Sequence, residues 1–185
     1  MQPTDQLSYI LPALSSLVDR IDATQLDNPT PCAEFTVNGV LDHMITLGGS
    51  FAYWFRGEEA PEITPPPADG SVPAAEFRAT MDALLDAVKS PGAQERMISA
   101  PIGDLPGEVF ARLVAFDGLI HGWDMATATG LSYEIPVYVI DAVDQFARQA
   151  LTPEMRDGDT FKDETVAPHG ASQLEQLVAF SGRTL

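Results

Sequence analysis

The chain has 185 residues, of which 45% are apolar, and its 27 acidic against 10 basic residues give a formal net charge of −17. This length is typical of one domain with its own hydrophobic core, so we expect a single domain over residues 1–185. The acidic balance argues against nucleic acid and anionic membranes as partners, and without a recognisable signal peptide or membrane span the sequence predicts a cytoplasmic protein.

Two amphipathic helices are predicted in the first third of the chain. Apolar residues between Thr4 and Ile21 recur with a period close to 3.6, which indicates a helix that Pro12 either kinks or delays. A turn cluster, DNPTP at residues 27–31, separates this helix from the next. Thr36 is a suitable N-cap for the second helix and Gly57 a suitable end, and its apolar positions include Val40, Leu41, Met44, Ile45 and Leu47.

A proline-rich connection and a third helix follow. Residues 58–72 include the run Pro65–Pro67 and have no helical period, so they are predicted to form an extended surface loop. Pro73 is placed at the first position of the third helix, which the sequence Ser90-Pro91-Gly92 ends. Residues 96–101 are predicted to be a short extended piece.

The second half of the chain is predicted to hold two more helices and a short last one. Pro106 opens a fourth helix that ends at Gly130, and Pro136 opens a fifth. Residues 156–170 form a turn-rich tail, and the capping-box pattern SQLE at 172–175 then opens a short helix that ends at Gly182. The sequence therefore predicts an all-α four-helix bundle with a short additional C-terminal helix and an irregular tail.

The stretch FDGLIHGWDMATATG, residues 116–130, places polar side chains on one face of the fourth helix. Asp117, His121 and Asp124 are spaced by four and three residues, so they lie within one stripe. His43 lies among apolar residues of the second helix, pointing toward or along the apolar seam of a bundle. Together, His43, Asp117 and His121 would form a set of two imidazoles and one carboxylate, which suits Zn²⁺, Fe²⁺ or Ni²⁺ and leaves coordination positions open.

Each of these residues also has a purely structural interpretation. A histidine near an apolar face is more often a core or capping residue than a metal ligand, and an Asp four residues before a His is often an exposed ion pair. Asp124 is interpreted as an acceptor that orients His121, as the partner of an arginine, or as a solvated acid. His169 is predicted to be exposed, Cys32 to be a small buried apolar residue, and Trp54 and Phe55 to belong to the core.

Three segments together resemble the actinobacterial metal-binding branch of the DinB-like superfamily, which is related to the metal-binding domain of mycothiol-dependent maleylpyruvate isomerase. The segments are NPTPCAEFTVNGVLDHM (Asn28–Met44), LIHGWDMATATG (Leu119–Gly130) and FKDETVAPHGASQLEQLVAFSGR (Phe161–Arg183). The resemblance implies a four-helix bundle that holds one divalent metal through a histidine of the second helix and a carboxylate and a histidine four apart on a later helix. In this sequence those positions are His43, Asp117 and His121.

The sequence departs from this family's pattern at two positions. Related isomerases and thiol transferases have glutamate at the carboxylate position, where this chain has the shorter Asp117. Phe35 stands where a tryptophan is common in relatives. The resemblance therefore supplies a site and leaves the substrate open.

Two functional hypotheses follow from the resemblance. In the first, a divalent metal, with zinc expected and nickel or iron as alternatives, activates a small thiol such as mycothiol for transfer to an electrophile or for isomerisation. In the second, the protein is a non-catalytic metal-binding or stress-related module. An arginine in a cleft beside an open site would favour the first, and the sequence leaves open whether the protein is a monomer or a homodimer. The candidate arginines are Arg56, Arg78, Arg112, Arg148 and Arg183.

Overall fold

A computed structural model describes residues 1–64, 70–101, 103–152, 156 and 162–185 of the chain. In these residues the helices are α1 (Pro3–Val18), a 3₁₀ turn (Ala23–Gln25), α2 (Val37–Arg56), α3 (Ala74–Val88), α4 (Gly107–Thr129), α5 (Val137–Ala150) and α6 (Gln173–Phe180). The strands β1 (Met97–Ala100) and β2 (Gly103–Pro106) precede α4. The proline run Pro65–Pro67 and residues 157–161 of the predicted tail lie outside the described residues.

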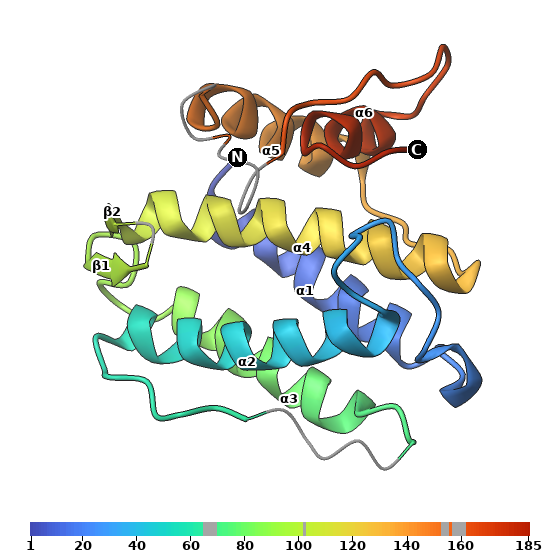
Figure 1. Cartoon of the computed structure of the whole chain (residues 1–185). Helices are drawn as coiled ribbons and strands as arrows, with labels where there is room; N and C mark the ends of the chain where they lie inside the picture. Colours follow the sequence, from blue (N-terminus) through green and yellow to red (C-terminus); the bar gives the residue numbers. More distant parts are fainter. Residues whose placement is uncertain (65–69, 102, 153–155, 157–161) are drawn as a thin grey trace.

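The helices α1, α2, α3 and α4 form the bundle (Figure 1). α1 packs against α3 and α4, and α2 packs against α3 and, at fewer positions, against α4. α5 and α6 contact each other and cover the outer side of α4 (Figure 1). This arrangement confirms the predicted all-α four-helix bundle, with α5 and α6 added on one side.

Several helix ends lie where the local sequence predicts them. The Thr36 side chain accepts a hydrogen bond from the Gly39 amide at the start of α2, and Gly57 and Gly130 end α2 and α4 at φ values of 76° and 69°. These left-handed conformations favour glycine because it has no Cβ. Pro12 does not delay the start of the first helix, which was one of the two alternatives, since α1 begins at Pro3 and continues through Pro12. The missing amide donor at Pro12 is therefore tolerated within the helix.

A two-stranded hairpin was only half predicted. β1 lies within the extended piece expected at residues 96–101, and it pairs in antiparallel register with β2, Met97 opposite Pro106 and Ile98 opposite Leu105. The second strand has the sequence GDLP, which is too short to show alternation and carries Gly and Pro, two residues depleted in strands. Only pairing with β1 identifies it as a strand.

Helix α4 lies between the other bundle helices and the α5–α6 layer (Figure 1). For this reason it buries residues around most of its circumference, including the polar side chains of His121 and Asp124. A helix with this burial positions polar groups inside the protein, where each needs a partner. None of the described helices is long and apolar enough to cross a membrane.

Candidate metal centre

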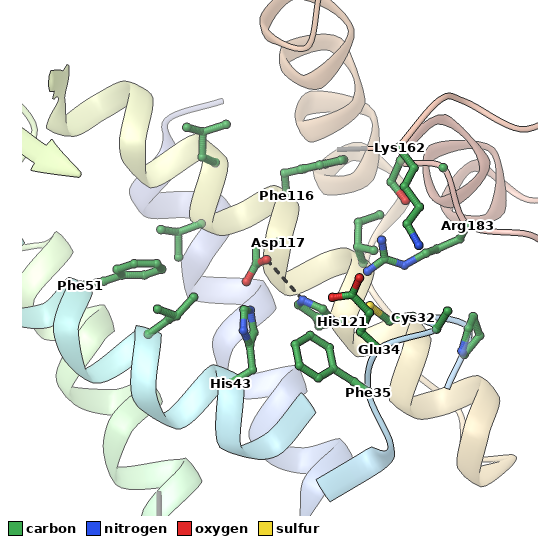
Figure 2. A pocket seen from close by; sticks show the side chains of 18 of the residues that line it. Cys32, Glu34, Phe35, His43, Phe51, Phe116, Asp117, His121, Lys162 and Arg183 are labelled. Atoms are coloured by element: carbon green, nitrogen blue, oxygen red, sulfur yellow. Dashed lines mark ion pairs between the residues drawn. The ribbon is translucent and has the colours of Figure 1, made fainter. Parts of the chain in front are cut away.

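The packing of α2 against α4 brings His43, Asp117 and His121 together. One potential ligand atom from each residue lies within 4.8 Å of those of the other two. The imidazole rings of His43 and His121 have their centroids 4.9 Å apart. Figure 2 shows the three side chains converging from the two facing helices. Among the described residues, no further His, Cys, Asp or Glu joins these three as a potential metal ligand.

His121 is held between two carboxylates on its own helix. Its Nδ1 lies 3.1 Å from Asp124 Oδ2 and its Nε2 lies 3.5 Å from Asp117 Oδ1. A buried carboxylate accepts a hydrogen bond, so Asp124 favours the tautomer with the proton on Nδ1. The Nε2 lone pair then faces Asp117 and His43.

Asp124 also binds Arg183 near the end of the chain. Arg183 Nε donates to Oδ1 at 3.3 Å and Nη2 to Oδ2 at 3.0 Å, while the Asp124 side chain is fully buried. Two of the roles considered for Asp124 are therefore filled at once, since it both orients His121 and pairs with an arginine. The Arg183 backbone is itself fixed, because its amide donates to Val178 and its carbonyl accepts from the Thr165 hydroxyl.

The two histidines have opposite pKa shifts. Burial lowers the pKa of His43, and the neighbouring Asp117 offsets only part of this effect. Burial also disfavours protonated His121, but Asp117 and Asp124 outweigh it and raise the pKa of His121 above its ordinary value. The two carboxylates thus favour a positive charge at His121, whereas burial favours the neutral imidazole at His43.

One buried polar atom of the candidate ligands lacks a hydrogen-bond partner. His43 Nε2 is buried and makes no hydrogen bond to any described residue. A buried polar atom normally has a partner, so an orphaned imidazole nitrogen beside a carboxylate and a second imidazole fits a metal ligand. The side chain of Asp117, which is 42% exposed, lies on the open side of the group.

The loop before α2 closes one side of the site. The Phe35 ring lies 5.2 Å from the His43 ring and 6.2 Å from the His121 ring, centroid to centroid. The loop is anchored to the end of α4, because the Asn28 side chain donates to the Ala128 carbonyl at 2.9 Å. Thr30 closes the loop on itself through its amide and its hydroxyl, which both donate to the Phe35 carbonyl.

A cavity of about 390 Å³ opens beside the three residues. His43, Asp117 and His121 line it together with Cys32, and Arg183 is the one candidate arginine among the described lining residues (Figure 2). The other four candidate arginines bond elsewhere, namely Arg56 to the Ala83 carbonyl, Arg78 to Asp19, Arg112 to Glu108 and Arg148 to Asp144.

The remaining sequence predictions have mixed outcomes. His169 is exposed and Phe55 is fully buried, as predicted, and Trp54 packs against the core. Cys32 lies half-buried at the cavity wall, whereas a buried residue was predicted. Its pKa is raised mainly by burial, although Arg183 opposes the shift.

Two charged lining residues, Glu34 and Lys162, were not identified from the sequence. Both lie on irregular segments whose course no local pattern predicts. The only available signal was their place within the segments that resemble the family.

Comparisons with known proteins identify the family of the chain. A family model described as "Mycothiol maleylpyruvate isomerase N-terminal domain" matches residues 9–126. Two uncharacterized proteins from two strains of Mycobacterium tuberculosis are 33% identical to the chain over 175 residues, which is 94% of this chain and 93% of each relative.

Solved structures share the fold at low sequence identity. The crystal structure of the mycothiol-dependent maleylpyruvate isomerase superposes with a TM-score of 0.57 at 14% identity, covering 78% of this chain and 68% of that chain. A histidine-to-alanine mutant of that isomerase gives the same values. The chain belongs to the DinB-like family of the mycothiol maleylpyruvate isomerase N-terminal domain.

Proposed function

We propose that this protein binds one divalent metal ion through His43, Asp117 and His121 and uses it in a transfer or isomerisation that depends on a small thiol such as mycothiol. The observation that carries the proposal is the buried His43 Nε2, which has no described partner and lies with Asp117 and His121 at a cavity wall. The name of the structurally similar isomerase supports a thiol partner.

The donor set favours zinc, with nickel or iron as alternatives. Two imidazoles and one carboxylate are a common protein ligand set for these ions and leave positions open for a further ligand. A divalent ion bound there would lower the pKa of a coordinating thiol and so make a thiolate available at neutral pH.

The protein's own residues orient the ligands and the thiol. Asp124 keeps the proton of His121 on Nδ1, which directs Nε2 into the site, and Arg183 neutralises Asp124. Arg183 and Lys162 line the same cavity, where they would donate hydrogen bonds to the amide and hydroxyl oxygens of mycothiol. The Phe35 ring, which also lines the cavity, packs beside both imidazoles.

The non-catalytic alternative predicts that a fourth protein ligand completes the coordination of the metal and leaves no position for a thiol. The described residues instead offer three candidate ligands and an adjoining cavity with a largely buried arginine, which supports the catalytic hypothesis. Metal binding without any response to a thiol would favour the non-catalytic module.

The proposal is tested by metal analysis and thiol titration of protein purified without a histidine tag. We expect stoichiometric divalent metal, lost in His43→Ala and His121→Ala and retained in His169→Ala, whose histidine is exposed in the tail. Helical circular dichroism should persist in all three variants, because apolar burial holds most of the core.

The thiol is then added to cobalt-substituted protein. We expect mycothiol to produce sulfur-to-cobalt charge-transfer absorption and to release about one proton per site near neutral pH. A cobalt spectrum that stays unchanged with mycothiol and other bacterial thiols would overturn the thiol-dependent reaction.

A further inference from the structure

The cavity extends along the α2–α4 interface on both sides of the three candidate ligands. The helices run antiparallel, because His43 of α2 contacts His121 of α4 while Phe51 lies 4.9 Å from Phe110. Eight residues separate His43 from Phe51, which corresponds to about 12 Å along a helix. The Phe51–Phe110 contact therefore lies about two helical turns from the imidazoles.

One end of the cavity is apolar. We define the apolar end by five lining residues of α2 and α4, which are Leu47, Phe51, Phe110, Leu113 and Val114. None of these side chains carries a polar atom. The half-buried ring of Trp54, which is not among the described lining residues, lies 5.4 Å from the Phe51 ring and 5.9 Å from the Phe110 ring, so further aromatic surface adjoins this end.

The other end of the cavity holds its cations. Arg183 binds Asp124, one helical turn beyond His121 on the side away from Phe110. Lys162 and Glu34 line the cavity near Arg183, and Figure 2 shows these three residues on the opposite side of His121 from Phe51. The charged groups are thus separated from the apolar end by His43, Asp117 and His121.

The two ends of the cavity suit the two substrates of a thiol transfer differently. A thiol rich in hydroxyl and amide groups would find hydrogen-bond donors at the end that Arg183 and Lys162 line. A carboxylate at the apolar end would lose its hydration without gaining a hydrogen-bond donor from the described lining residues. An uncharged ring would instead pack against Phe51 and Phe110 in the offset or edge-on geometry that aromatic groups favour.

We propose that the apolar end binds the second substrate, and that this substrate is an uncharged apolar electrophile with its reactive carbon directed toward His43 and Asp117. The inference rests on the proposed thiol-dependent function. For an activated aryl halide, the thiol sulfur forms a bond to the ring carbon, the carbon–halogen bond breaks, the halide leaves with the electron pair and the thiol proton passes to solvent. No oxidant or reductant is needed.

The test compares two ligands of the same shape. 1,3-Dinitrobenzene is uncharged and has no leaving group, whereas isophthalate carries two carboxylates on the same ring. We expect calorimetry on the metal-free protein to detect binding of 1,3-dinitrobenzene, with quenching of tryptophan fluorescence that persists in a Trp123→Phe variant, which keeps only Trp54. Isophthalate should neither bind comparably nor displace it.

Two variants locate the binding site. Leu47→Gln and Leu113→Gln each place an amide at the apolar end and should weaken 1,3-dinitrobenzene binding about tenfold, because a buried amide there lacks a partner. Leu85→Gln changes a half-buried leucine of α3 outside the cavity lining and should leave binding unchanged. Circular dichroism confirms folding, and two independent positions keep the test valid if one variant fails to fold.

The outcomes separate this inference from the proposed function. Thiol-dependent cobalt absorption together with equal or tighter binding of isophthalate would overturn the apolar electrophile and leave the thiol site intact. Equal affinities of the Leu113 and Leu85 variants would also overturn it. Specific 1,3-dinitrobenzene binding by a protein that takes up no metal would support the apolar site and reject the metal-dependent reaction.

Discussion

Asp124 and Arg183 form an ion pair inside the protein although 59 residues separate them in sequence. The carboxylate is fully buried, the arginine side chain is 15% exposed, and Nη2 lies 3.0 Å from Oδ2. Through Asp124, the C-terminal segment that follows α6 is joined to His121 at the candidate metal centre.

The first prediction concerns this ion pair. Arg183→Met keeps length and removes charge, so it should lower the free energy of unfolding by about 3 kcal/mol because Asp124 remains buried without its cation. Arg78→Met is the matched control, since the Arg78–Asp19 pair is exposed and should cost less than about 1 kcal/mol. Urea unfolding followed by circular dichroism measures both, and equal losses would contradict a structural role for the buried pair.

A second prediction separates the two carboxylates beside His121. Asp117→Asn removes the charge of a candidate ligand, whereas Asp124→Asn removes the charge of a group that orients His121 and pairs with Arg183. Asp124→Asn should weaken metal binding about 10–100-fold, and Asp117→Asn should weaken it further. Competition with a chromophoric chelator measures both affinities. The reverse order would mean that Asp124 is the metal ligand.

Gly122 provides a third prediction, on the packing next to His121. A Cβ at this position would overlap two carbons of the Tyr133 ring. Gly122→Ala should therefore lower stability by about 1–3 kcal/mol, although Gly→Ala within a helix otherwise stabilises by about 0.5–1 kcal/mol. In a Tyr133→Ala background the same change should cost nothing, and a persistent cost in thermal unfolding would assign the effect to another contact.

The fourth prediction is a pH dependence at the start of α6. Glu175 accepts hydrogen bonds from the Ser172 amide and hydroxyl, and these lower the pKa of Glu175 from its ordinary value of 4.5. Because the folded pKa is the lower one, the stabilisation is complete above pH 4.5 and is lost as pH falls through the folded value. Glu175→Gln should abolish this contribution, and Ser172→Ala should cost about 1 kcal/mol at neutral pH.

Unfolding curves between pH 3 and 7 test the capping box. The difference in stability between the natural protein and Glu175→Gln should shrink toward acidic pH. A difference that is constant with pH would show that the carboxylate charge does not contribute to the cap.

Local patterns in the sequence determined the helices and the face on which the candidate ligands lie. Thr36, Gly57 and Gly130 set helix ends through backbone geometry and hydrogen bonds that reach only a few residues. The spacing of Asp117 and His121 is likewise a property of one helix, so their proximity was predictable without any other element.

Tertiary structure decided which distant groups meet those ligands. His43 reaches His121 only because α2 packs antiparallel to α4, and Arg183 reaches Asp124 only because α6 and the following residues pack on the outer side of α4. Neither contact has a local signal, because packing between elements depends on the sum of many apolar contacts along the chain. The sequence likewise gives no sign that Leu47, Phe51 and Leu113 line one cavity. Only the fold places them at one end of it, with Arg183 and Lys162 at the other end.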